Sequence, residues 1–323
     1  FDTNFTADLT IMEEGSELLH RVKKALVDGE KVALPQFSSC SPGWINYMEH
    51  FNPELLPNLS TCKSPQQMFG AVAKTYYAEK IGVKPEDMVV VSIMPCTAKK
   101  YEAARPEMND SGVQDVDIVL TTRELGAMIK QAGIDFRGLP DEEMDAPLGI
   151  STGAADIFAN TGGVMEAALR TVYEVVTGRE LPTDGLHVVP IQGLEGLKEA
   201  SLTFSECVPE WSFLEGVTAK VAVAHGLANA HKVCERVAKG EGGYHFIEVM
   251  CCPGGCIGGG GQPRSTTDEV RKARIAAIYH EDEGRPLRKS HTNPAITEIY
   301  EEFLGEPGGH TSHKLLHTHY QSK

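Results

Sequence analysis

The sequence predicts an α/β protein of two lobes, each built on a small, mostly parallel sheet flanked by helices. Strand-like and helix-like segments alternate along much of the chain. In addition, two short apolar strands, one ending near residue 96 and one near residue 250, both run directly into cysteine. Ligands bind at the carboxyl ends of strands in such sheets. We therefore expect a cofactor in the cleft between the lobes.

The first lobe is predicted from two strands and the helix that precedes them. Ser64 at an N-cap position, Pro65 at the first helical position and Gly82 at the end bound that helix. The run "MVVVSIMPC" (88–96) is short, apolar and β-branched, which is typical of a buried parallel strand. After it, "VDIVLTTREL" (116–125) predicts a strand that enters a helix through a capping box.

The second lobe and the end of the chain are predicted in the same way. A strand, a helix and a second strand are expected at 217–226, 227–240 and 244–252. From about residue 270 the sequence is polar, with a helical pattern in "NPAITEIYEEFLG" and four histidines spaced H-x-x-H-x-x-x-H-x-H in the last stretch. We expect a surface or interface tail there; a metal site at these histidines is the alternative.

Composition narrows the class of protein. The chain has 323 residues, 41% of them hydrophobic and 23% charged, as in ordinary globular proteins. Its formal charge of −15 argues against nucleic acid and anionic membranes as partners, and no run of about 18 apolar residues predicts a membrane span. Because the chain begins at Phe1 rather than at methionine, we take the N-terminus as processed or trimmed. We expect a cytoplasmic location, and a periplasmic one stays open.

The eight cysteines are too sparse for a disulfide scaffold, so we expect reduced thiols with a metal among them. Cys252 and Cys256, in "CPGGC", have the short spacing of thiolate ligands to zinc or to an iron–sulfur cluster. The paired C-x-x-C motifs of zinc ribbons are absent, and the glycine run lacks the Lys-Ser/Thr of a phosphate loop. Further candidates are Cys96 in "IMPCTAKKYE", and Cys40 with Ser41 in "FSSCSPGW". Three other cysteines are expected to be structural thiols: Cys62, Cys207 and Cys234.

Three segments together resemble the signatures of the catalytic domain of iron-only (FeFe) hydrogenases. That family carries T-S-C-C-P-x-W, M-P-C-x-x-K-x-x-E and E-x-M-x-C-x-x-G-C. Here the segments read "SSCSPGW" (38–44), "MPCTAKKYE" (94–102) and "EVMCCPGGC" (248–256). The second and third match fully, and the resemblance continues through "GGGQP" and "RKSH" to the end of the chain.

The resemblance implies an H-cluster, which is a 4Fe-4S cubane joined through a cysteine sulfur to a two-iron unit with CO, cyanide and a bridging dithiolate amine. Position by position, Cys96, Cys252 and Cys256 would hold the cubane, with Cys256 as the bridging thiolate. Lys99 would donate a hydrogen bond to a cyanide. Residues at the two strand ends would pack against the two-iron unit: Met94, Pro95 and Met250.

The first signature departs from the family pattern at its second cysteine, which is a cubane ligand in the family and aligns with Ser41 here. The family's first cysteine, which relays protons, aligns with Cys40. Three outcomes stay open: Ser41 ligates iron through its oxygen, Cys40 ligates after a small shift of the turn, or Cys251 supplies the sulfur. Cys251 stands where the family has a small residue. We take Ser41 as the aligned ligand and place Cys40 beside the two-iron unit.

A proton route is also predicted. Catalysis that consumes protons in a buried site needs groups within hydrogen-bond reach of one another. Glu14 and Glu17 lie three residues apart and share one side of a helix, which without the resemblance indicates a solvated helix face. In the family, protons pass through such a glutamate pair, the thiol of the first signature, and a Ser and a Gln that match Ser60 and Gln66.

The implied activity is reversible oxidation of H2 and reduction of protons. Electrons would be exchanged with an external ferredoxin-like iron–sulfur domain or subunit, because this chain has no C-x-x-C motifs for further clusters. Residues 1–268 would form the catalytic domain, and residues 269–323 a tail that resembles the small subunit of two-chain members and wraps the lobes. The family's domain usually starts some tens of residues earlier, so we expect this chain to be part of a longer polypeptide or of a complex.

Two other functions stay open from the sequence. One is a non-catalytic iron–sulfur assembly factor of the related eukaryotic branch, which keeps several cysteines but lacks the two-iron pocket. The residues retained here speak against it: Met94, Lys99, Met250, Glu14 and Glu17. The other is a hydrogen sensor with low turnover. Such sensors typically alter the first signature at the relay cysteine, and the first signature is altered here.

Overall fold

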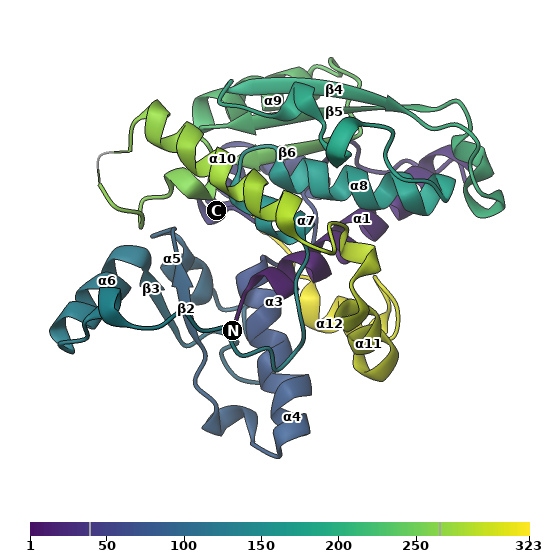
Figure 1. The fold of residues 1–323 in the computed structure, drawn as a ribbon. Coiled ribbons are helices and arrows are strands. Elements are labelled where there is room, and N and C mark those ends of the chain that lie inside the picture. Colours follow the sequence, from purple (N-terminus) through teal and green to yellow (C-terminus); the bar gives the residue numbers. More distant parts are fainter. Residues whose placement is uncertain (39, 265) are drawn as a thin grey trace.

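The larger of two sheets has four strands in the order β1-β6-β5-β4. Their bounds are β1 Gln36–Phe37, β6 Phe246–Met250, β5 Thr218–His225 and β4 Leu197–Thr203. The first three are parallel, and β4 is antiparallel at the edge. The computed structural model describes residues 1–38, 40–264 and 266–323, and it confirms the predicted α/β class with two small sheets (Figure 1).

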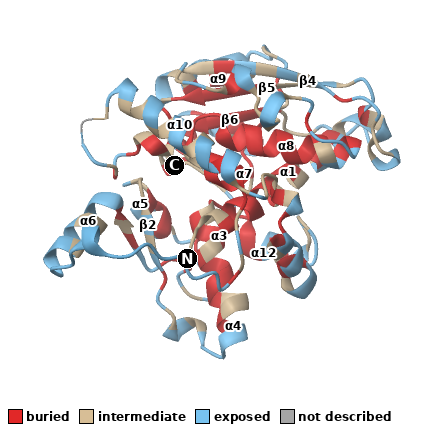
Figure 2. Ribbon diagram, in the orientation of Figure 1, coloured by how far each residue is buried: buried red, intermediate tan, exposed pale blue. Residues whose placement is uncertain are grey.

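Helices cover both faces of this sheet: α1 (Asn4–Leu26) and α8 (Gly163–Thr177) on one, and α2 (Pro42–Phe51) and α9 (Leu227–Ala238) on the other. Alternate residues of β5 face the two layers, with Val221 and Val223 toward α1 and α8, and Ala222 and Ala224 toward α2 and α9. Every residue of β6 is buried, as expected of a parallel strand between two helix layers. Figure 2 shows buried residues gathered along this sheet and the helices against it.

The smaller sheet consists of two parallel strands, β2 (Val91–Met94) and β3 (Ile118–Thr121). β3 runs into α6 (Thr122–Gln131) through the predicted capping box of Thr121 and Glu124. β2 leads through a short loop into α5 (Lys99–Ala103). Both strands are therefore followed by a helix, of which the sequence predicted the one after β3.

The prediction that 88–96 forms a buried strand is wrong in one respect. Val91, Ile93 and Ile118 are 46%, 40% and 47% exposed. The packed side chains lie on the opposite face of the sheet, where Val119 meets Ala103. Apolar, β-branched composition predicts a strand, but burial on both faces also requires a layer on each side, and a sheet of two strands has only one such layer in the described residues.

The helical segment before β2 begins and ends as predicted. It comprises α3 (Pro65–Val72), a π-helical turn (Ala73–Tyr77) and α4 (Ala78–Ile81). Ser64 caps its start by accepting a hydrogen bond from the Gln67 amide, and Gly82 ends it with φ at 68°.

The C-terminal tail contacts both lobes. Its helices are α10 (Asp268–Gly284), α11 (Pro294–Ile299) and α12 (His310–Leu316). α10 packs on the short helix α7 (Gly153–Asp156), α11 on α1, and α12 on α3. None of the helices in the described residues is long and apolar enough to cross a membrane.

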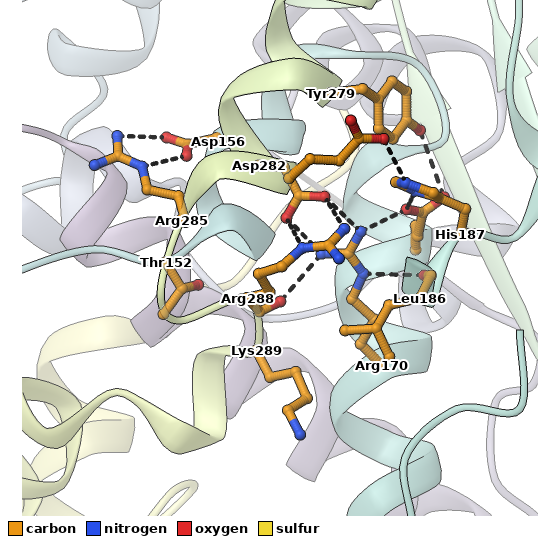
Figure 3. A network of polar contacts seen from close by, with 12 residues as sticks. Thr152, Asp156, Arg170, Leu186, His187, Tyr279, Asp282, Arg285, Arg288 and Lys289 are labelled. Carbon is orange, nitrogen blue, oxygen red and sulfur yellow. Dashed lines mark hydrogen bonds and ion pairs between the residues drawn. The ribbon is translucent and has the colours of Figure 1, made fainter. Parts of the chain in front are cut away.

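A buried ion network fastens α10 to α8 (Figure 3). Arg170 on α8 donates to both oxygens of Asp282 on α10, at 2.8 and 2.9 Å, and to Glu166 one turn earlier at 2.7 Å. Arg288 donates to the same Asp282 carboxylate at 2.6 Å. The side chains of Arg170, Asp282 and Glu166 are fully buried, so water cannot replace their partners. These ion pairs therefore anchor the tail to α8.

Candidate metal centre

A cavity of about 400 Å³ lies where the carboxyl ends of β2 and β6 meet the first turns of α1 and α2. Its lining includes five of the eight cysteines: Cys40, Cys96, Cys251, Cys252 and Cys256. All five are free thiols. Met94, Pro95 and Met250 line the same cavity, as does Ser41. The structure thus brings together every residue that the sequence predicts to hold or contact a cluster.

Glycines allow the loop after β6 to pack against the loop after β2. The Gly261 amide donates to the Pro95 carbonyl at 2.8 Å, which joins the two loops. A Cβ at Gly259 would lie 2.2 Å from that same carbonyl oxygen, so no side chain fits there. This close approach sets Cys96 beside Cys256, although the two thiols come from different lobes.

The spacing of the thiols suits a multi-iron cluster better than a single ion. A tetrahedral zinc ion, with Zn–S bonds of about 2.3 Å, holds its sulfurs about 3.8 Å apart. Among the described residues, only Glu17, Cys62 and His317 bring three such ligand atoms within 4.8 Å of one another, and they lie outside the cavity. Burial, and then the Cys96 thiolate, raise the pKa of Cys256 to about 12, so its thiolate form requires a cation beside it. Because no three of the cavity thiols come within 4.8 Å of one another and the cavity has a volume of about 400 Å³, the thiols fit an iron–sulfur group better than a single ion.

Lys99 forms part of the cavity wall and is held there by Glu102. Its ammonium contacts both Glu102 oxygens at 2.8 and 3.0 Å and the Cys40 carbonyl at 2.9 Å. Ser64 and Gln66 donate to Glu102 in turn, at 2.8 and 3.1 Å. Burial acts to lower the pKa of Lys99, but the Glu102 carboxylate and then Cys40 more than offset it, and the net pKa is raised. The cavity therefore holds a fixed positive charge that suits an anionic ligand.

The structure places Gln66 in this Lys99 group and not beside the glutamate pair. Its side-chain oxygen accepts a hydrogen bond from Ser92 at 2.8 Å, and its amide donates to Glu102. Gln66 also lines the cavity. Its part in proton transfer stays a prediction, whereas its part in holding Glu102 follows from these contacts.

A chain of acidic groups leads from the cavity towards the surface. Glu14 on α1 is 2% exposed and Ser60 is fully buried. The Ser60 hydroxyl lies between the Glu14 carboxyl and that of Glu17, to which it donates at 2.8 Å. The Glu17 side chain is 14% exposed and pairs with Arg21 at 2.7 Å. On the cavity side, Cys40 is an electrostatic neighbour of Glu14. Four of the residues predicted for the proton route therefore follow one another from cavity to surface.

Glu14 has a pKa suited to passing protons. Burial first, and then the charge of Glu17, raise the pKa of Glu14 from 4.5 to about 8. A group exchanges protons best when its pKa lies near the working pH. Glu14 can therefore take up and release a proton near neutrality, and the Ser60 hydroxyl can pass it to the second carboxyl.

Replacing Glu14 by glutamine should flatten the dependence of stability on pH. Between the ordinary pKa of 4.5 and the folded pKa of about 8, the folded chain binds a proton at Glu14 that the unfolded chain has lost. The free energy of unfolding should then fall as pH rises through this window, by up to about 1.4 kcal/mol per pH unit. Glu14→Gln cannot ionise, so urea unfolding of the metal-free protein at a series of pH values should show a smaller slope. Glu79→Gln, on the exposed surface of α4, serves as the control. Equal slopes for wild type and Glu14→Gln would contradict the raised pKa.

Two buried glutamates within the quoted signatures have no role in the sequence-based prediction. Glu102 positions Lys99, as described. Glu248 on β6 accepts hydrogen bonds from the amides of Gly162 and Met165, at 2.6 and 2.8 Å, at the start of α8. This carboxylate fixes the end of β6 just before its cysteines. A lone glutamate inside the apolar strand "FIEVM" was the available signal, because a charge there requires buried donors.

The tail adds polar groups behind the acid chain. His317 bonds Glu13 through Nε2 at 2.9 Å and the Thr61 hydroxyl through Nδ1 at 2.7 Å. Tyr300 donates to the other Glu13 oxygen at 2.5 Å. The rings of His313 and His317 stack 4.6 Å apart. In the described residues no three tail histidines come together as ligands, although His317 lies in a group of possible ligand atoms with Glu17 and Cys62. The interface role of the tail stays a prediction.

The fold and the cavity together define a class of protein, in which two α/β lobes present cysteine thiols for an iron–sulfur cluster at the ends of their strands. Residues 1–260 match the model of the iron-only hydrogenase large subunit, C-terminal domain, and residues 268–323 match that of the iron hydrogenase small subunit. The chain therefore belongs to the iron-only hydrogenase family.

Individual relatives agree with this assignment. The NADP-reducing hydrogenase subunit HndD of Solidesulfovibrio fructosivorans is 55% identical over 99% of this chain and 53% of its own length. The periplasmic [Fe] hydrogenase large subunit of Nitratidesulfovibrio vulgaris is 53% identical over 81% of this chain and 59% of its own length. The chain spans about half the length of these curated relatives.

Solved structures and a more distant relative complete the comparison. A variant of apo [FeFe]-hydrogenase HydA1 from Chlamydomonas reinhardtii superposes with a TM-score of 0.86 at 47% identity, covering 100% of this chain and 84% of that one. A cytosolic Fe-S cluster assembly factor of Danio rerio is 29% identical over 100% of this chain and 76% of its own length. Hydrogenases and assembly factors thus share this fold.

Proposed function

We propose that this chain binds an H-cluster and with it catalyses the reversible interconversion of H2 with protons and electrons. One observation carries the proposal. The same cavity holds a set of cluster-type thiols and borders the inner end of an acid chain that reaches the surface at Glu17. Hydrogen chemistry requires both a redox centre and a path for protons, and a site that only stores a cluster requires no such path.

Cys96, Cys252 and Cys256 are the residues that would hold the cubane, and Cys256 would bridge to the two-iron unit. When bound, this group supplies the redox-active iron for the reaction with H2. Met94 and Met250 would exclude water from one side of it, since both line the cavity. Lys99 would balance negative charge through the ammonium that Glu102 holds in place.

Protons would move through groups of this chain alone. The Cys40 thiol would exchange a proton with Glu14, which Ser60 connects to Glu17. Each carboxyl can accept a proton on one oxygen and release one from the other, so a net transfer requires only that the Ser60 hydroxyl rotate. Glu17 then exchanges with water at the surface.

Electrons would come from an iron–sulfur domain or subunit outside this chain. The three remaining cysteines have separate surroundings: Cys62 lies by Glu17, Cys207 by Glu215, and Cys234 by Met48. The described residues therefore offer no second cluster site. A ferredoxin-like partner that docks near Cys252, which is only partly buried, would complete the enzyme.

Turnover of H2 tests the proposed function. The chain, produced with the machinery that builds an H-cluster, should evolve H2 from a reduced viologen dye in place of its electron partner. Glu17→Gln should evolve H2 at least tenfold more slowly with unchanged iron content, because its carboxyl is the surface end of the acid chain. Glu79→Gln should match the wild type. A chain that binds the complete cluster without evolving or oxidising H2 would instead support the assembly or sensor role.

A further inference from the structure

Cys251 is a cavity thiol that the family's signatures do not require. It follows Met250 at the end of β6, and it lines the cavity next to Cys252. The backbone of Gly43 packs directly on it, since a Cβ on Gly43 would lie 2.9 Å from the Cys251 sulfur. The start of α2 therefore packs against this thiol.

Ser41 directs its hydroxyl to Cys251. A serine at an N-cap position normally accepts a hydrogen bond from its own helix, but Ser41 makes no such cap bond to α2. Its hydroxyl donates instead to the sulfur of Cys251. Ser41, which aligns with a ligand cysteine of the family, thus contacts a cysteine that directly follows β6.

The neighbours of Cys251 and Cys40 differ. The charged groups that act on Cys251 are Cys252 and Cys96, two predicted cubane ligands. The charged groups that act most strongly on Cys40 are Lys99, Cys256 and Glu14. Cys40 is therefore coupled mainly to Cys256 and to the acid chain, and Cys251 is coupled to the other two predicted cubane thiols.

We propose that Cys251 supplies the fourth thiolate of the cubane and that Ser41 is a hydrogen-bond donor to it. The inference rests on the proposed function, because it presupposes a four-iron cluster in this cavity. On binding, the Cys251 thiol loses its proton to solvent and an iron–sulfur bond forms, with no change in oxidation state. Iron in such clusters prefers thiolate to alkoxide, so a sulfur in contact with Ser41 displaces the serine oxygen as ligand. The fourth ligand is thus Cys251 and not the residue at position 41, which it contacts. Cys40 is then not a ligand and can carry protons.

Iron and sulfide content of the purified chain, with the electron paramagnetic resonance spectrum of the reduced cubane, tests this assignment without H2 turnover. Cys251→Ala should lose the cubane, with bound iron at least tenfold lower. The exchange variant Ser41→Cys with Cys251→Ala should regain the cubane, because residue 41 then supplies the sulfur that residue 251 has lost. Ser41→Ala and Cys40→Ala should both keep full iron, and Ser41→Ala should shift the reduction potential of the cubane, since it removes a hydrogen bond to a ligand sulfur. Cys234→Ala, a buried thiol outside the cavity, is the matched control.

The outcomes separate the alternatives. Full iron in Cys251→Ala would overturn the proposal, and loss of iron in Cys40→Ala or Ser41→Ala would assign the ligand to that residue instead. Circular dichroism of each metal-free variant shows whether it folds. If Cys251→Ala does not fold, recovery of both the fold and the cubane in the exchange variant would still support the assignment. An exchange variant that binds no iron would contradict it. A wild-type chain that binds no cubane would contradict the proposed function itself.

Discussion

Replacing Cys40 by alanine should lower the rate of H2 evolution by about 10²- to 10⁴-fold, the usual range for loss of a positioned proton donor. The thiol lines the cavity and neighbours Glu14, so it is placed to join the cluster to the acid chain. Iron content and the spectrum of the cubane should not change, because the four proposed cubane ligands are Cys96, Cys251, Cys252 and Cys256 and do not include Cys40. The rate is measured with reduced viologen, per assembled cluster.

The comparison for Cys40→Ala is Cys234→Ala, which removes a buried thiol that does not line the cavity. That variant should evolve H2 at the wild-type rate. A Cys40→Ala chain that keeps the wild-type rate would show that protons reach the cavity by another route. One that loses the cubane would make Cys40 a ligand.

Replacing Arg170 by methionine should lower the free energy of unfolding by about 3–5 kcal/mol. The substitution keeps an apolar stem but removes the cation between Asp282 and Glu166, whose side chains are fully buried. Arg288 still pairs with Asp282, but the Asp282 carboxylate then has one arginine partner instead of two. Urea unfolding of the metal-free chain measures the loss, and limited proteolysis should cut first in α10, which this network holds to α8.

Arg179→Met is the matched control for that prediction. Arg179 pairs with Glu206 at the surface, where the two side chains are 44% and 76% exposed. An exposed pair contributes about 1 kcal/mol or less, so this variant should be almost as stable as the wild type. Equal, small losses for Arg170→Met and Arg179→Met would show that the tail does not depend on the buried network.

The sequence predicted those features that neighbouring residues determine. The capping box at Thr121 and the helix between Ser64 and Gly82 form as expected, because their signals lie within one or two turns. The strand-end cysteines Cys96 and Cys252 share one cavity, since both sheets present their carboxyl ends to it. Their role as ligands stays a prediction.

Features that depend on distant partners could not be predicted. The exposure of Val91 follows from the number of strands in its sheet, which no local pattern states. The pairing of Glu13 with His317 joins the first helix to the last turns of the chain. The sequence likewise showed a surplus thiol at Cys251 and a missing one at Ser41, but only the fold shows that the two side chains touch.

The central claim is that this chain carries an H-cluster and not a cubane alone, and infrared spectroscopy of the matured chain tests it most directly. The stretching bands of metal-bound CO and cyanide fall in a region where protein absorbs little. We predict bands of both kinds, and we predict that they shift when H2 is admitted. A chain that binds a full cubane but shows neither band after maturation would contradict the claim and would place the protein with the assembly factors.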